Sequence, residues 1–296
     1  MEMIQDLKAK TMVVTGATSG IGRAVARALA LRGAHVIGVG RSEQRCREAQ
    51  SAILADFPTA HISFAVADLA SQHQVVQLAE DIRAVVTASS GGKLDVLINN
   101  AGTVSSWRKV TEDGYELQFA VNHLAPFLLT HELMPLLQAA GEARVITVSS
   151  GSHYRTKMHW TDVMYRRGYG VLKSYKQSKL ANVLFTAEFN RRVGGTGVRA
   201  YAADPGLVNT SIGLKGTGGL ARTVWQWRSG RGTSPGAAAE TVVFLATDPS
   251  AGDSAEIYWK ARRPKAPSAY AQRGDEAARL WELSARLCGV GSATAA

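Results

Sequence analysis

Short apolar runs rich in β-branched residues alternate along this chain with longer segments in which apolar residues recur every three or four positions. The short runs predict buried strands at residues 12–14, 35–39, 62–66, 96–98, 144–148 and 198–202. The longer segments predict helices at residues 23–30, 75–86, 117–138 and 180–192. Because strands and helices alternate and the strands lack a polar face, the pattern predicts a parallel sheet with helices on both sides.

The end of the chain adds two weaker elements. Residues 256–259 predict a last strand and residues 275–287 a C-terminal helix, both within a C-terminal extension at 255–296. The 296 residues are 46% hydrophobic and contain no linker or repeat before the last few residues. We therefore expect one domain, 1–296, of the α/β class, with a doubly wound parallel sheet of about seven strands.

Residues suited to ligand binding follow the predicted strands. In a parallel sheet the carboxyl ends of the strands lie at one edge, and ligands bind in the crevice there. This edge would receive one residue after each of six strands: Gly16, Arg41, Asp68, Asn99, Ser150 and Pro205.

The loop after the first strand reads Thr-Gly-Ala-Thr-Ser-Gly-Ile-Gly, residues 15–22, and leads into a helix. Gly16 suits a tight turn, Gly20 a close approach of the backbone to phosphates, and Gly22 close packing of helix on strand. A strand, glycine loop and helix in this order bind the pyrophosphate of a dinucleotide at the helix N-terminus. An ordinary glycine-rich turn is the alternative.

Tyr175 and Lys179 are four residues apart in a segment that we expect to be helical, so their side chains share one face. A phenol has a pKa of about 10, and a nearby ammonium in a water-poor pocket lowers the free energy of the phenolate. The pair therefore indicates proton transfer.

The motifs TGxxxGxG, Asn-Asn-Ala-Gly at 99–102 and YxxxK together resemble the short-chain dehydrogenase/reductase family in its single-domain branch, over residues 10–212. Segments 121–124, 178–186 and 195–198 are most similar to its retinol dehydrogenase-like group. The resemblance implies a Rossmann fold and hydride transfer between a nicotinamide cofactor and a carbonyl or alcohol carbon.

The resemblance also implies a catalytic tetrad. Tyr175 would be the general acid or base, Lys179 would assist it and bind the nicotinamide ribose, and Ser150 would polarise the substrate carbonyl. Ser150 is preferred over Ser149 because its spacing to Tyr175 matches the retinol dehydrogenase-like pattern. Asn122 would retain a water in a proton relay to Lys179, or else be an amide bonded to a local carbonyl. Pro126 could kink that helix.

For the cofactor, Arg41 and Ser42 follow a strand end where NAD-preferring relatives carry an acid. A guanidinium can bind a 2′-phosphate, so NADP(H) is expected over NAD(H), unless Arg41 is only a surface arginine. Asp68 and Leu69 would contact adenine, or Asp68 would cap the next helix. The remaining positions that the resemblance implies for cofactor binding are Gly16, Thr18, Ser19, Gly20, Ile21, Gly22, Asn99, Ala101, Gly102, Tyr175, Lys179, Pro205, Gly206, Val208 and Thr210.

The charge distribution and the absence of certain motifs limit the classes of ligand that we expect. The formal charge is +10, with 13 basic against 14 acidic residues in 1–150 and 21 against 10 in 151–296. The basic half favours an anionic cofactor or acidic substrate, or is simply solvated. Nucleic acid is not expected, because no helix-turn-helix, zinc-finger or RNP-type signature is present. No metal site is expected either, since neither the histidines nor Cys46 and Cys288 have ligand spacing.

Residues 207–235 are rich in glycine and basic residues and include Trp225 and Trp227. The resemblance implies that this segment is a substrate lid, although its tryptophans could instead pack on the core or lie on a membrane surface. No apolar run is long enough to span a membrane, so we expect a cytoplasmic protein with peripheral membrane contact at most. A homodimer is possible, although the C-terminal extension could block its surface.

Together these observations predict an NADP(H)-dependent oxidoreductase that interconverts a hydrophobic aldehyde or ketone and its alcohol. One alternative is a specialised reductase of a polyketide, steroid or tetrapyrrole, including reduction of a C=C bond. Another is a non-catalytic nucleotide-binding scaffold on the same fold.

Overall fold

The computed structural model describes residues 6–207 and 233–291, and eight of its strands form one sheet. The order is β3-β2-β1-β4-β5-β6-β7-β8; the first seven are parallel and β8 is antiparallel to β7. This confirms the doubly wound sheet, with one short strand beyond the expected seven. The strands are β1 (Thr11–Thr15), β2 (His35–Gly40), β3 (Ile62–Val66), β4 (Val96–Asn99), β5 (Ala143–Val148), β6 (Val198–Asp204), β7 (Tyr258–Lys260) and β8 (Arg263–Pro264).

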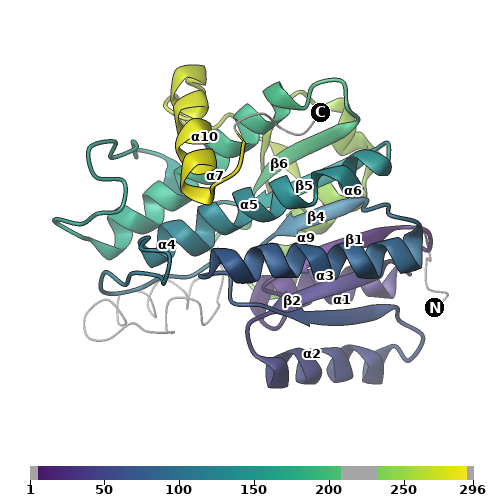
Figure 1. Cartoon of the computed structure of the whole chain (residues 1–296). Helices are drawn as coiled ribbons and strands as arrows, with labels where there is room; N and C mark the ends of the chain where they lie inside the picture. The colour runs from purple at the N-terminus through teal and green to yellow at the C-terminus, as the bar shows by residue number, and fades with distance from the viewer. Residues whose placement is uncertain (1–5, 208–232, 292–296) are drawn as a thin grey trace.

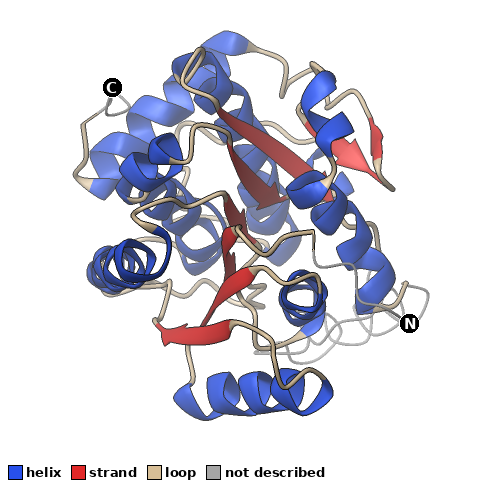
Figure 2. Cartoon of the chain, turned by 90° about the vertical axis from the view of Figure 1, so that its right-hand side faces the viewer, coloured by secondary structure: helices blue, strands red, loops and turns tan. Residues whose placement is uncertain are grey.

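Helices cover both faces of the sheet (Figures 1 and 2). Successive strand residues point to opposite faces, so Met12 and Val14 pack with α1 (Gly20–Leu31), α2 (Glu43–Asp56) and α9 (Pro235–Thr247). Val13 belongs to the other face, where the covering helices are α3 (Gln72–Ser90), α5 (Ala125–Glu132), α6 (Met134–Ala139) and α7 (Val171–Arg192). Two short 3₁₀ helices, η2 (Gly151–His153) and η4 (Pro249–Asp253), follow β5 and α9.

The single helix expected at 117–138 is wrong in detail. The chain instead forms α4 (Leu117–Phe119), a π-helical turn η1 (Ala120–Leu124), α5 and α6. Pro126 lies in the first turn of α5 and Pro135 in that of α6. Proline lacks an N–H and its ring clashes with the carbonyl four residues back, so each proline begins a new helix instead of continuing one.

The C-terminal helix α10 (Gly274–Cys288) lies across α5 and α7 (Figure 1). Its Trp281 is 4% exposed, with its ring centroid 4.9 Å from that of Phe127 and 5.9 Å from that of Phe185. The guanidinium carbon of Arg192 lies 4.8 Å from the same ring. The expected C-terminal helix is therefore confirmed, and it packs as part of the domain.

We expect Trp281→Ala to lower the free energy of unfolding by about 3–5 kcal/mol, because it leaves a cavity among buried aromatic rings. Urea denaturation would measure the loss. Arg286→Ala, an exposed change on the same helix, is the control and should cost less than about 0.5 kcal/mol. Equal stability of the two variants would show that α10 is not anchored by this indole.

Candidate active site

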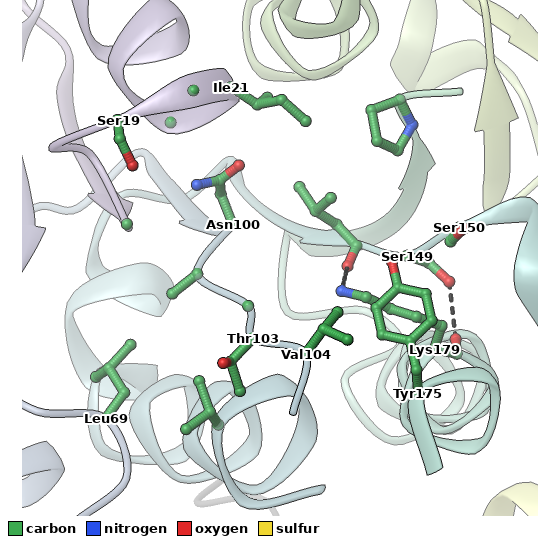
Figure 3. A pocket seen from close by; sticks show the side chains of 18 of the residues that line it. Ser19, Ile21, Leu69, Asn100, Thr103, Val104, Ser149, Ser150, Tyr175 and Lys179 are labelled. Carbon is green, nitrogen blue, oxygen red and sulfur yellow. Dashed lines mark hydrogen bonds between the residues drawn. The ribbon is translucent and has the colours of Figure 1, made fainter. Parts of the chain in front are cut away.

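A cavity of about 1200 Å³ opens at the carboxyl ends of the parallel strands. Its lining comes from the loops that follow β1, β2, β3, β4, β5 and β6 and from the first half of α7. Small-molecule sites usually span about 300–1,000 Å³, so this cavity has room for a dinucleotide together with a second, smaller molecule. Figure 3 shows Ser19, Ile21 and Asn100 in one part of it and Ser150, Tyr175 and Lys179 in another.

The glycine loop lines the cavity with Gly16, Thr18, Ser19, Gly20, Ile21 and Gly22. Gly16 has a φ of 69°, where residues with a Cβ are strained. A Cβ on Gly22 would lie 2.3 Å from the carbonyl oxygen of Gly16. The Ser19 side chain makes no capping bond and the first turn of α1 carries no acid, so its N–H groups suit an anionic pyrophosphate.

Arg41, Ser42 and Arg45 line the cavity where β2 ends. Ser42 is the N-cap of α2 and accepts a hydrogen bond from Arg45 N at 3.4 Å. We did not assign Arg45 from the sequence, although a second arginine four residues after Arg41, in the first turn of a helix, was the available signal. Two guanidinium groups here suit a phosphate ester.

Asp68 and Leu69 also line the cavity. The Asp68 carboxylate accepts from Ala70 N at 3.0 Å, whereas the N-cap of α3 is Ser71, whose hydroxyl accepts from Gln74 N. The alternative in which Asp68 caps the following helix is therefore wrong.

The Asn-Asn-Ala-Gly segment is divided between the core and the cavity. Asn99 is 2% exposed, does not line the cavity, and donates from its amide to Thr130 Oγ1 at 3.0 Å. The cavity is lined instead by Asn100, Ala101 and Gly102. Pro205 and Gly206 line it after β6, while Val208, Thr210 and most of the expected 207–235 lid lie outside the described residues.

Tyr175 and Lys179 lie one turn apart on α7, and both line the cavity. The Lys179 Nζ lies 5.8 Å from the centre of the Tyr175 ring and donates to the carbonyl oxygen of Val148 at 2.9 Å (Figure 3). Lys179 is only 4% exposed, and this burial lowers its pKa to about 8. At neutral pH most molecules therefore carry a cation beside the phenol.

The two adjacent serines differ in what they bond. Ser149 is buried, and its hydroxyl donates to the Lys179 carbonyl at 2.8 Å. The Ser150 oxygen accepts from Ser152 N at 3.1 Å, so its hydroxyl proton can be directed elsewhere. Both line the cavity, but Ser150 is the one whose hydrogen bond leaves its hydroxyl proton for a bound molecule.

Asn122 lies in the π-helical turn, is fully buried and does not line the cavity. Its oxygen accepts from Thr103 N at 2.7 Å, and its nitrogen donates to Thr103 O and to Ser178 Oγ. These contacts tie the loop after β4 to the residue that precedes Lys179. The side chain therefore acts on the position of the loop and of α7.

Apolar residues also line the cavity. These residues lie near the sequence motifs, but an apolar residue type alone does not indicate a position in a binding site. They include Val104, Leu117, Val121 and Leu172.

Within the described residues, no group of three His, Cys, Asp or Glu side chains is placed to bind a metal ion. A bilayer-spanning helix is likewise not found in ranges 6–207 and 233–291.

Comparisons with known proteins agree with this geometry. Retinol dehydrogenase 13 of Homo sapiens is 36% identical over 288 residues, or 95% of this chain and 85% of that protein. Polyprenol dehydrogenase of Mus musculus is 36% identical over 291 residues, or 95% and 84%. The crystal structure of an uncharacterized protein from Mycobacterium paratuberculosis has a TM-score of 0.75 and 31% identity, covering 98% of both chains.

A family model described as short chain dehydrogenase matches residues 10–216, which include every strand from β1 to β6, the glycine loop and the Tyr175–Lys179 pair. The chain belongs to the short-chain dehydrogenase family, and is an oxidoreductase that uses a nicotinamide cofactor to interconvert alcohol and carbonyl groups.

Proposed function

We propose that this protein is an NADP(H)-dependent oxidoreductase of a hydrophobic aldehyde or ketone and its alcohol, with Tyr175 as general acid and base. The observation that carries the proposal is the buried ammonium of Lys179, 5.8 Å from the Tyr175 ring on the wall of the cavity. An apolar substrate is supported by Val104, Leu117 and Leu172 in the lining. It is also supported by the names of two relatives, a retinol and a polyprenol dehydrogenase.

In the reducing direction, a nicotinamide cofactor held by the glycine loop and Lys179 would supply the hydride to the carbonyl carbon. Ser150 donates a hydrogen bond to the carbonyl oxygen and stabilises the negative charge that develops on it. Tyr175 then gives its phenolic proton to that oxygen, and the Lys179 cation stabilises the phenolate that remains. In the oxidising direction the same phenolate accepts the proton of the alcohol.

NADP(H) is proposed over NAD(H) because the residue after β2 is Arg41, with Arg45 one helical turn further on. A carboxylate at this place would repel a 2′-phosphate, whereas guanidinium groups donate charge-assisted hydrogen bonds to it. Asp68 and Leu69, which also line the cavity, would contact the adenine.

Tyr175→Phe tests the chemistry. We expect kcat with NADPH and a panel of aromatic and aliphatic aldehydes to fall by about 10²–10⁴-fold, because the proton donor is removed. NADPH binding, followed by its fluorescence, should persist. Tyr115→Phe is the matched control, since that hydroxyl donates to Leu287 O outside the cavity. Turnover close to wild type in Tyr175→Phe would refute the assignment.

Arg41→Ala tests the cofactor preference. Hydrogen bonds to a charged group contribute about 1.5–3 kcal/mol, so KM for NADPH should rise about 10–100-fold while KM for NADH changes little. Steady-state kinetics with both cofactors give the ratio. The control is Arg47→Ala, because Arg47 pairs with Glu43 on the same helix and does not line the cavity. An equal rise for both cofactors would contradict phosphate recognition.

Lys179→Met tests the buried charge through pH. The pKa of Lys179 is about 8 in the folded protein and about 10.4 in an unfolded chain, so between these values the unfolded state binds more protons. Wild-type stability should therefore rise relative to Lys179→Met by about 3 kcal/mol between pH 7 and pH 10.5. The Val148 carbonyl keeps a second donor, Asn182 Nδ2, in the variant.

Urea denaturation of both proteins across this range measures the difference, in which the titration of all other groups cancels. The exposed Lys157→Met exchange is the control and should leave the difference flat. A difference for Lys179→Met that does not change with pH would show that the ammonium is solvated in the folded protein.

A further inference from the structure

The turn that carries Ser150 is bonded to a segment far along the chain, residues 265–268, which follows β8. Ser268 N donates to His153 Nε2 at 3.1 Å, and Tyr154 donates from its hydroxyl to Ala266 O at 2.5 Å. The Lys265 ammonium lies 4.8 Å from the centre of the Tyr154 ring. This segment lies outside the stretch that matches the family model, which ends at residue 216.

The contact with Ser268 decides where the proton of His153 lies. A backbone N–H can only donate, so Nε2 must accept and carries no hydrogen. The proton is then on Nδ1, which lies 2.9 Å from the carbonyl oxygen of Ser150 and donates to it. His153 is fully buried, and burial lowers its pKa, so the neutral ring is favoured.

Packing fixes the plane of this ring. Its centroid lies 4.1 Å from that of Tyr154 and 4.7 Å from that of Tyr258. Tyr258 is fixed in turn, because its hydroxyl donates to the buried carboxylate of Asp204 at 2.8 Å. The imidazole therefore has one tautomer and one orientation, both set by residues from β6, β7 and the 265–268 segment.

We propose that His153 is a positioning residue for Ser150, and that the 265–268 segment acts on catalysis through it. The inference rests on the proposed role of Ser150 as the donor to the substrate oxygen. The peptide after Ser150 is fixed by two donors to one carbonyl, His153 N at 3.1 Å and His153 Nδ1. This peptide sets the direction of the Ser150 Cβ, and with it the direction of the hydroxyl.

Two exchanges separate the two hydrogen bonds of the ring. In His153→Asn the amide nitrogen can take the place of Nδ1 and donate to Ser150 O, while the bond from Ser268 is lost. In His153→Gln the amide oxygen can reach the place of Nε2 and accept from Ser268 N, while the bond to Ser150 is lost. Each variant loses one hydrogen bond, so the two should be destabilised to a similar extent.

If His153 positions Ser150, His153→Gln lowers kcat about tenfold with KM for NADPH unchanged, and His153→Asn restores kcat to within about twofold of wild type. His159→Asn, in an exposed part of the same loop, is the control and leaves kcat unchanged. Equal kcat in the Gln and Asn variants, whether both high or both low, would overturn the proposal, because a structural role does not distinguish them.

A second measurement does not need turnover. In protein labelled with ¹⁵N-histidine, the ring nitrogens of His153, assigned by its loss in His153→Gln, should show the neutral Nδ1–H tautomer at neutral pH. An Nε2–H tautomer would overturn the inference. A wild-type protein that reduces no carbonyl with NADPH would instead contradict the proposed function, and the NMR result would still decide whether Ser268 sets the tautomer.

Discussion

The buried ammonium of Lys179 is the constraint on which the active site depends. A charge that is 4% exposed needs a partner, and here the partner is the Val148 carbonyl at the end of β5. The hydroxyl of Ser149, the residue after β5, donates to the Lys179 carbonyl, so the same helical turn is bonded to this end of the strand a second time. With α7 fixed in this register, Tyr175 follows one turn earlier and faces the cavity. The depressed pKa of Lys179 shows that the solvation lost on burial is not fully replaced.

The same helix shows why the fold was only partly predictable. Parallel strands are apolar on both faces, and all six early strands were found at their correct places in the sequence. The second half of α7 was found because apolar residues recur among its buried positions. Its first half, which we also expected to be helical around Tyr175 and Lys179, has no such apolar period, because Ser174 and Ser178 are buried against Glu116 and Asn122. Polar residues that pair with distant loops leave no hydrophobic period.

The site residues could be predicted where the requirement is local in sequence, and not where it depends on contacts with distant residues. Local requirements, such as a glycine with positive φ at Gly16, can be recognised within a few residues of sequence. Long-range contacts cannot, and the Asn99–Asn100 pair illustrates this: neighbouring residues at a strand end point in opposite directions, and only the position of Thr130 shows which of them faces the core. The cavity-facing Arg45 and the bond between His153 and Ser268 depend equally on tertiary structure.

The C-terminal extension packs against the same helix, α7, that carries Tyr175 and Lys179. At one end of α7, Phe185, Phe189 and Arg192 surround Trp281 of α10; at the other end are Tyr175 and Lys179. Without α10, these side chains would lose the cover of the indole, and α7 would be held by its other apolar contacts in the core and by the polar contacts near the cavity. The polar contacts near the cavity also orient the residues proposed for catalysis. Apolar packing at the far end of α7 therefore adds stability to the helix without using the residues near the cavity. The last helix therefore stabilises the helix that carries Tyr175 and Lys179, although none of its residues lines the cavity.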